Sequence, residues 1–160
     1  MILGLMSDTH GKADVAKLAV SQLRFRGAEF IIHCGDVGPT NILDYLAGEP
    51  AAFVWGNNDF DRREGARYAR SIGVQCLDVF GELELDGKQI AVTHGDDLYQ
   101  LNPALSSGKY DYVFTGHTHE PHDQMVGKTR WINPGALYRA RRKTIATLDL
   151  STDTLGIWEV

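Results

Sequence analysis

The chain has 160 residues, of which 43% are hydrophobic and 23% charged, fractions that are typical of globular domains and exclude fibrous and disordered classes. This length fits one domain with a sizeable core, so we expect a single domain over residues 1–160. The formal net charge of −5 argues against a broad nucleic-acid-binding surface, which usually needs net positive charge, but leaves room for a local cationic site.

The cysteines and the N-terminal segment indicate a reducing compartment. Cys34 and Cys76 stand far apart and form no CxxC pair, so a secreted disulfide scaffold is not expected. Residues 1–6 are apolar but too brief for a signal peptide, and no apolar run is long enough to span a bilayer. We therefore expect a cytoplasmic protein that does not enter the membrane.

The first half of the chain alternates between predicted strands and helices. Apolar runs at residues 1–6, 30–33 and 51–55 predict three buried strands. Segments 13–26, 40–46 and 62–72 predict helices; Gly48 and Gly73 end the second and third, and Asp61 is a candidate cap for the third. This βαβαβα order favours a parallel sheet.

The second half is rich in strands. Residues 82–85 and 88–92 flank Asp86-Gly87, which is a strong hairpin signal. Further strands are predicted at 110–115, 130–132, 144–150 and 155–160. Two packed sheets with helices on the outside would satisfy both halves of the chain.

Polar residues of the kinds that bind metals follow the predicted strands directly, where α/β sheets build their sites from loops. In chain order they are Asp8 and His10, then Asp36, Asn57, His94, and finally His117 and His119. Glycines adjoin most of them, which allows tight turns and close backbone approach.

This set suits a pair of transition-metal ions. It offers three carboxylate or amide oxygens and four imidazoles, a mixture that suits Mn²⁺, Fe, Co, Ni or Zn²⁺ better than Ca²⁺ or Mg²⁺. Seven ligands are too many for one tetrahedral ion but fit two ions that share a bridging carboxylate. Each short motif alone usually means only a cap or a turn. Their occurrence in order, each at a strand end, favours the metal site.

The motif order resembles the calcineurin-like metallophosphoesterase superfamily. That family reads D-x-H, G-D, G-N, G-H or its shortened form, then G-H-x-H, and all five occur here between Asp8 and His119. The later sequence Ile132-Asn133-Pro134-Gly135 is also similar. The small size and the Gly-Asn-x-Asp form resemble the compact bacterial and archaeal phosphodiesterase branch. Gly-Asp-Val-Gly at residues 35–38 departs from the protein Ser/Thr phosphatases.

The resemblance implies a fold and a ligand for each metal. The fold would be α/β, a four-layer sandwich of two mixed β-sheets flanked by helices. One metal would be held by Asp8, His10, Asp36 and His119, and the other by Asp36, Asn57, His94 and His117. Asp36 would bridge the two ions. We expect both ions to be Mn²⁺.

Two such ions, about 3.5–4 Å apart, lower the pKa of a bridging water and neutralise charge on the phosphoryl oxygens. The resulting hydroxide would attack phosphorus without a covalent enzyme intermediate. We expect Asp36, Asn57 and His94 to act in catalysis, together with Asn58 and Asp59 beside them.

The identity of a general acid is open. Many family members read Gly-Asn-His at the third motif, whereas this chain reads Gly-Asn-Asn, and neutral Asn58 cannot transfer a proton at a useful pKa. Asp59, His33 or His122 could take that role instead. The alternative for Asp59 is a helix cap, for His33 a buried strand residue, and for His122 a surface loop residue.

The expected activity is hydrolysis of phosphodiester bonds in a small-molecule substrate. The alternatives are a non-catalytic protein-interaction scaffold of the same fold, and a phosphomonoesterase or nucleotide hydrolase. Such scaffolds tend to lose ligand histidines, and here every expected ligand is present. Nucleic acid is not the expected partner, and a homo-oligomer is compatible with the sequence.

Overall fold

The computed structural model describes all residues, 1–160, and contains two mixed β-sheets. The first sheet runs from edge to edge as β11 (Thr154–Glu159), β10 (Thr144–Asp149), β1 (Ile2–Met6), β2 (Phe30–His33), β3 (Ala51–Phe53) and β4 (Gln75–Cys76). The second runs as β5 (Phe80–Leu85), β6 (Lys88–Thr93), β7 (Tyr112–Phe114), β9 (Thr129–Pro134) and β8 (Pro121–Val126).

Strand direction changes within each sheet. Strands β1 to β4 are parallel, while β10 and β11 add to the edge of β1 in antiparallel fashion. In the second sheet β6, β7 and β9 are parallel, and β5 and β8 form antiparallel hairpins with β6 and β9. The parallel pattern of the first half and the hairpin at Asp86-Gly87 are both as predicted.

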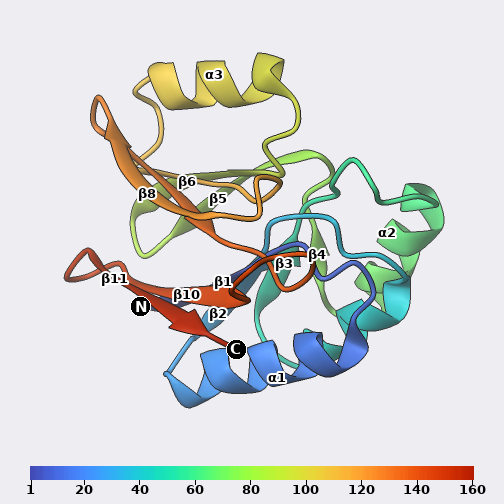
Figure 1. Cartoon of the computed structure of the whole chain (residues 1–160). Helices are drawn as coiled ribbons and strands as arrows, with labels where there is room; N and C mark the ends of the chain where they lie inside the picture. Colours follow the sequence, from blue (N-terminus) through green and yellow to red (C-terminus); the bar gives the residue numbers. More distant parts are fainter.

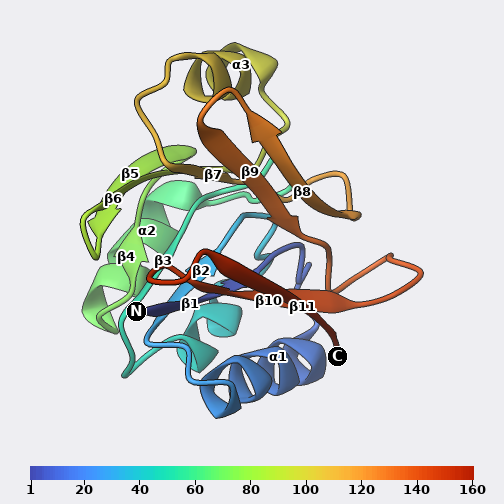
Figure 2. The same cartoon turned by 90° about the vertical axis from the view of Figure 1, so that its left-hand side faces the viewer.

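Helices cover the outer face of each sheet (Figures 1 and 2). The first sheet is covered by α1 (Ala13–Phe25), by the 3-10 helix η1 (Thr40–Tyr45) and by α2 (Arg62–Ser71), and the second by α3 (Leu98–Ser106). The expected four-layer sandwich is therefore confirmed. None of the helices is long and apolar enough to cross a membrane.

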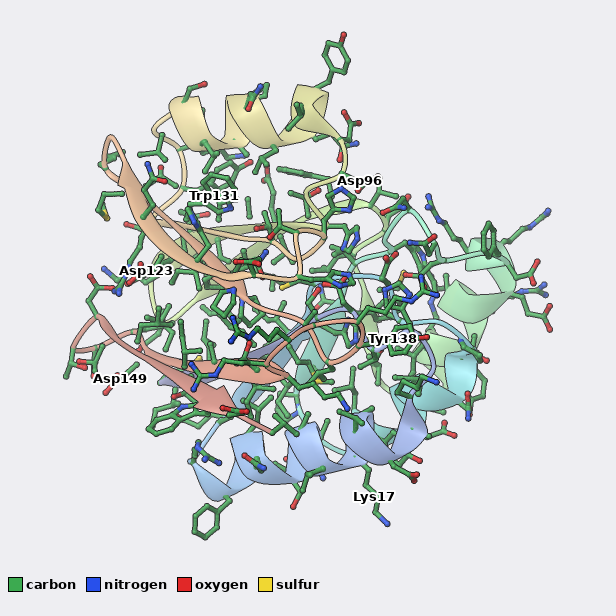
Figure 3. The ribbon with its side chains drawn as sticks, in the orientation of Figure 1. Lys17, Asp96, Asp123, Trp131, Tyr138 and Asp149 are labelled. Carbon is green, nitrogen blue, oxygen red and sulfur yellow. The ribbon has the colours of Figure 1, made fainter.

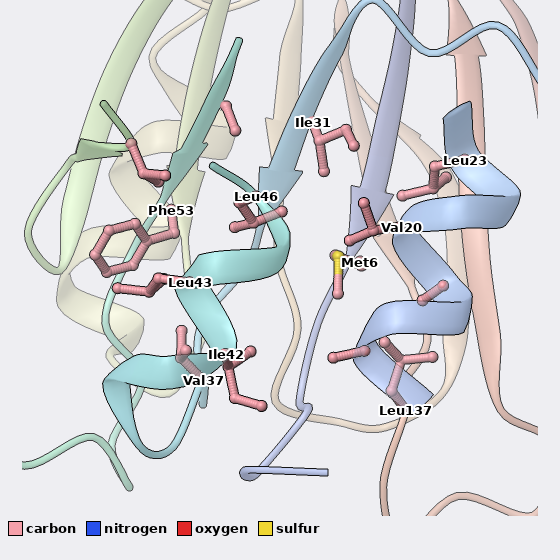
Figure 4. Packing of buried hydrophobic residues seen from close by; sticks show 14 of the residues in the cluster. Met6, Val20, Leu23, Ile31, Val37, Ile42, Leu43, Leu46, Phe53 and Leu137 are labelled. Carbon is pink, nitrogen blue, oxygen red and sulfur yellow. The ribbon is translucent and has the colours of Figure 1, made fainter. Parts of the chain in front are cut away.

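Three apolar layers hold the sheets and helices together. The first lies between the six-stranded sheet and its helices, where Leu23, Leu43 and Phe53 are fully buried (Figure 4). The second lies between the two sheets and includes Leu5 and Phe114, and a smaller third packs α3 onto the second sheet. Burying an aliphatic or aromatic side chain stabilises the fold by about 1.5–3 kcal/mol, so these layers are what hold the strand ends in place.

Three elements were not predicted, namely β4, α3 and β8. Helix α3 contains Pro103 and is only nine residues long, so its helical pattern is short and interrupted. Strand β8 is largely exposed and lacks an apolar run. Asp61 occupies the N-cap position of α2, as expected, but its backbone is left-handed and its side chain makes no capping hydrogen bond.

Candidate metal centre

The seven candidate ligands come from loops at the carboxyl ends of parallel strands. Asp8 and His10 follow β1, Asp36 follows β2, Asn57 follows β3, His94 follows β6, and His117 and His119 follow β7. Parallel strands end at the same edge of a sheet, so each sheet delivers its loops to one side. Figure 1 shows these loops meeting where the two sheets approach one another.

An uncommon backbone conformation marks most of these residues. Asp8, His10, Asp36, His117 and His119 all have positive φ angles, between 44° and 68°. Left-handed backbone is rare for residues other than glycine and costs about 1–3 kcal/mol per residue when strained. Half of the ten such residues in the chain are candidate ligands. The packed strands therefore hold several ligand loops in turns that the chain would not adopt alone.

The side chains of these loops converge on two buried carboxylates. The Asp36 Oδ2 atom lies 3.4 Å from His10 Nε2 and 3.4 Å from His94 Nε2. The Asp8 Oδ1 atom lies 3.1 Å from His119 Nε2 and 3.8 Å from the same two nitrogens. Asp8 is fully buried and Asp36 is 2% exposed. The cluster thus brings three imidazoles and two carboxylates together around one small space.

Three buried atoms in this cluster have no hydrogen-bond partner. They are Asp8 Oδ1, His10 Nε2 and His94 Nε2. Buried polar atoms in proteins are almost always paired, because an unpaired one costs about 1–3 kcal/mol. All three point toward the same group of ligands, and a cation placed among them would provide the missing partner. The donor set therefore fits a divalent metal ion.

The charges in the cluster shift the pKa values of its members. Burial alone would raise the pKa of Asp36, but His94 and the two Asn58 hydrogen bonds hold it well below its usual range. Burial would likewise lower the pKa of His94, and the carboxylates of Asp36 and Asp8 instead raise it to about 9. The carboxylates are therefore ionised near neutral pH, as metal ligands must be.

Two groups of three ligands are close enough to hold an ion. One comprises Asp8, His10 and His119, and the other comprises Asp8, Asp36 and His94. Asp8 thus belongs to both groups, whereas the resemblance assigned the shared position to Asp36 alone. The Asp36 carboxylate still lies midway between His10 and His94, because its Oδ2 atom is equally distant from both.

The remaining two candidates lie at the exposed side of the cluster. The His117 ring lies 5.2 Å from the His94 ring, and its backbone N–H donates to Asp8 Oδ2 at 3.2 Å. Asn57 is exposed in the loop that follows β3. The side chains of both residues are therefore exposed to solvent.

Asn58 and Asp59 both use their hydrogen-bonding groups to hold the ligand loops in place. Asn58 donates from its backbone N–H to Asp36 Oδ1 at 2.9 Å and from Nδ2 to Asp36 Oδ2 at 2.8 Å. The Asp59 carboxylate accepts from the backbone N–H groups of Val37, Gly38 and Gly56. Burial raises the pKa of Asp59 despite these bonds. Its side chain ties the loop after β2 to the loop after β3.

Other supporting residues were not singled out in the sequence. The Ser7 hydroxyl donates to Asp8 Oδ2 at 2.6 Å, and Asn133 Nδ2 donates to the Gly116 carbonyl at 2.6 Å. Gly116 itself packs so tightly that a Cβ atom there would overlap Ser7. Asn133 lies in the Ile-Asn-Pro-Gly sequence already noted, which was the available signal; Ser7 had none beyond its place beside Asp8.

The two histidines that were candidates for the general acid, His33 and His122, differ in their surroundings. His33 is fully buried, and its Nε2 lies 2.9 Å from the hydroxyl of Thr9. Thr9 stands between the candidate ligands Asp8 and His10 in the sequence. His122 lies in β8, not in a loop, and its ring centroid lies 4.4 Å from that of Trp131, with the two ring planes tilted by 58°. Neither ring is within the groups of candidate ligands.

A cavity of about 680 Å³ lies against α2 and β4, away from the candidate ligands. Its lining residues include Arg63, Arg70 and Trp55. It contains none of the candidate ligands. Arg62, which also lines it, donates instead to the carbonyls of Gly56 and Asp59. The metal centre is thus a separate site.

Comparison with known proteins agrees with this geometry. Residues 1–153 match the model of the calcineurin-like phosphoesterase superfamily domain. The chain is 32% identical over 154 residues to the phosphodiesterase MJ0936 of Methanocaldococcus jannaschii, covering 93% of each protein. It is 31% identical over 145 residues to the probable metallophosphoesterase MJ0623 of the same organism, covering 85% of this chain and 68% of that protein.

Solved structures show the same arrangement. A structure of an archaeal phosphodiesterase superposes with a TM-score of 0.93 at 30% identity, covering all of both chains. The E. coli phosphoesterase Yfce, at 19% identity and with full coverage of both chains, shares the fold with a TM-score of 0.72. Vps29 of Entamoeba histolytica with bound zinc, at 20% identity over 99% of this chain and 91% of that one, also shares it, with a TM-score of 0.68. This chain belongs to the calcineurin-like phosphoesterase superfamily.

Proposed function

We propose that residues 1–160 form one metal-dependent phosphodiesterase domain that holds two divalent cations. The observation that carries the proposal is the set of unpartnered buried atoms, Asp8 Oδ1, His10 Nε2 and His94 Nε2, facing one another beside Asp36. The name of the M. jannaschii relative, a phosphodiesterase, supports the diester as the substrate class.

The proposed ligands are those that the motifs indicated. Asp8, His10, Asp36 and His119 would hold one cation, and Asp36, Asn57, His94 and His117 the other. Mn²⁺ suits this mixture of nitrogen and oxygen donors, and Fe, Co, Ni or Zn²⁺ would also suit it. When bound, such cations activate water and neutralise charge that develops on the phosphoryl oxygens.

The protein's own residues set the positions of these ligands. Asn58 restrains both Asp36 oxygens, and Asp59 fixes the backbone just after Asp36 and just before Asn57. Placing reacting groups correctly matters, because a displacement of about 1 Å can cost about 10²-fold in rate. Neither residue is arranged to donate a proton to a leaving group, so we expect the chain to cleave best the diesters whose leaving groups need none.

We place the protein in the cytoplasm. Cys34 is buried, burial raises the pKa of its thiol, and neither cysteine forms a disulfide. Unpaired cysteines of this kind are common in a reducing compartment.

Metal reconstitution and turnover together test the proposal. Metal-stripped protein is reloaded with Mn²⁺, the metal content is measured by elemental analysis, and hydrolysis of bis(p-nitrophenyl) phosphate is followed. We expect two equivalents of Mn²⁺ per chain and metal-dependent turnover. Asp36→Asn should lose turnover by orders of magnitude with its circular dichroism unchanged. Asp14→Asn, an exposed carboxylate on α1, is the matched control and should behave as the unmodified protein.

The outcomes separate the alternatives. A limit of one Mn²⁺ per chain with full activity would reject the two-metal centre. Faster hydrolysis of p-nitrophenyl phosphate than of the diester would indicate a phosphomonoesterase. Metal binding without hydrolysis of either compound would indicate a scaffold of the same fold.

A further inference from the structure

The loop that follows β9 brings a concentration of positive charge to the metal centre. After the buried residues Ala136 and Leu137, the chain exposes four cationic side chains, Arg139, Arg141, Arg142 and Lys143. In a protein with a net charge of −5, four cations within five residues are a strong local excess. Only Arg142 has an ionic partner, Glu159 at 3.2 Å. The other three are free to meet an anion.

Tyr138 joins this loop to a candidate ligand. Its ring centroid lies 5.4 Å from that of His10. The Lys12 ammonium lies 4.8 Å from the same centroid, and the Arg139 guanidinium carbon lies 5.2 Å from it. Figure 3 shows Tyr138 close to the N-terminal end of α1, where Lys12 lies. Cation–π attraction holds both cations beside one ring, so two positive charges are positioned next to the metal centre.

A second contact ties the loop to the ligand His119. The His119 Nδ1 atom donates to the Arg139 carbonyl at 3.4 Å. Arg139 has a left-handed backbone, with a φ of 51°, a conformation that is uncommon in a bulky residue and that often marks functional sites. The loop is thus anchored at His10 on one side and at His119 on the other.

A cavity of about 410 Å³ lies beside His119 and the later part of the loop, and its lining does not include Lys12, Tyr138 or Arg139. It is lined by His119, Arg141 and Thr144, and also by the acidic Glu120 and Glu159. This volume is within the range of small-molecule sites. Of the cationic lining residues, Arg141 has no acidic partner.

We propose that Lys12 and Arg139, positioned by Tyr138, form a subsite for a second phosphoryl group of the substrate. The inference rests on the proposed function and specifies its substrate class: a small phosphodiester that carries a further phosphate monoester, as a nucleotide with a second phosphate does. A scissile diester carries one negative charge, which the proposed metal cations would neutralise. Two more unpaired cations fixed beside them match an additional anionic group.

A matched pair of substrates tests the subsite. Thymidine 5′-(p-nitrophenyl phosphate) is compared with the same compound carrying a 3′-phosphate, so that the scissile bond and the leaving group are identical. We expect the 3′-phosphate to raise kcat/KM about tenfold, mainly through KM, because it gains charge-assisted contacts. The ratio of kcat/KM between the two substrates is measured within each variant. A change at Arg139 that displaces its neighbour His119 affects both substrates equally and cancels in this ratio.

Single variants Lys12→Gln and Arg139→Gln should each reduce that ratio, and the double variant should bring it close to one. Arg67→Gln removes an exposed, unpaired charge on α2 and should keep the full ratio. The advantage should also fall as salt increases, because exposed charges are screened. A ratio close to one in the unmodified protein, or an unchanged ratio in the double variant, would overturn the subsite.

Binding without turnover separates this inference from the proposed function. Calorimetry of the Mn²⁺-loaded protein with thymidine 3′,5′-bisphosphate and with thymidine 5′-phosphate should give the same preference and the same losses in the variants. If neither p-nitrophenyl nucleotide is hydrolysed, the phosphodiesterase proposal fails, whereas the binding ratio still decides for or against the subsite.

Discussion

The buried His33 should make the stability of the metal-free protein depend on pH. Gly35 donates its backbone N–H to His33 Nδ1 at 3.2 Å, and His33 Nε2 lies 2.9 Å from the Thr9 hydroxyl, which donates onward to the Val37 carbonyl. Only a neutral ring with its proton on Nε2 satisfies all three bonds. Protonation would place a second N–H against the Gly35 N–H.

The magnitude follows from the pKa of this residue. Burial lowers the pKa of His33, which is about 4 instead of 6.5. The charges of His94 and His10 add to this shift, whereas the carboxylates of Asp8 and Asp36 partly oppose it. Below pH 6.5 this histidine is therefore protonated in the unfolded chain but stays neutral in the folded protein. The free energy of unfolding then falls by about 1.4 kcal/mol per pH unit until the folded pKa is reached. Between about pH 7.5 and about pH 5 this amounts to about 2 kcal/mol.

Urea unfolding of metal-stripped protein across this range measures the effect. His33→Gln retains a donor toward Thr9 but does not titrate, so its stability should fall by about 2 kcal/mol less than that of the unmodified protein over the same interval. The other shifted groups, such as Asp36 and His94, are present in both proteins and cancel in the difference. Parallel curves for the two proteins between these pH values would refute a neutral buried His33.

Three further predictions concern the centre and the core. Cleavage rates of diesters should fall steeply as the leaving-group pKa rises, because Asn58 is neutral and its side chain is bonded to Asp36, so it supplies no proton. A flat dependence in the unmodified protein would contradict this prediction. Gly56→Ala places a Cβ atom on the Asp36 carboxylate, so turnover should fall by about 10²-fold with the fold retained; full activity would show that the loop yields. Phe114→Ala, between the sheets, should cost about 3–5 kcal/mol in thermal unfolding, and the exposed Phe60→Ala under about 0.5 kcal/mol; equal losses would contradict the layered core.

The strain in the ligand loops has a physical origin in the sheets. Asp8, His10 and Asp36 adopt left-handed turns that are unfavourable locally. Backbone hydrogen bonds between neighbouring loops hold them there, such as His10 N–H to the Asp36 carbonyl at 2.9 Å and Asp8 N–H to the Gly35 carbonyl at 3.0 Å. The folding energy of the apolar layers thus offsets the cost of presenting the ligands.

Much of the fold and the metal centre was predictable from local sequence patterns. Apolar runs such as residues 30–33 predict buried strands, and the ligands that follow them, such as Asp36, belong near one edge because parallel strands end together. The hairpin at Asp86-Gly87 was also predictable, because its turn depends on two adjacent residues.

The tertiary structure alone decided the contacts between segments far apart in the chain. Asp59 appeared free to be a cap or an acid, and only packing directs its carboxylate to amides more than twenty residues away. His33 could have been a proton donor or a buried strand residue, and only the tertiary structure shows it fully buried at the end of β2 and bonded to Thr9. Tyr138 had no motif at all; its place beside His10 and Lys12 depends on how the loop after β9 folds back over α1. Periodicity and spacing report on neighbours along the chain, whereas these roles come from contacts that form only when both sheets close around the site.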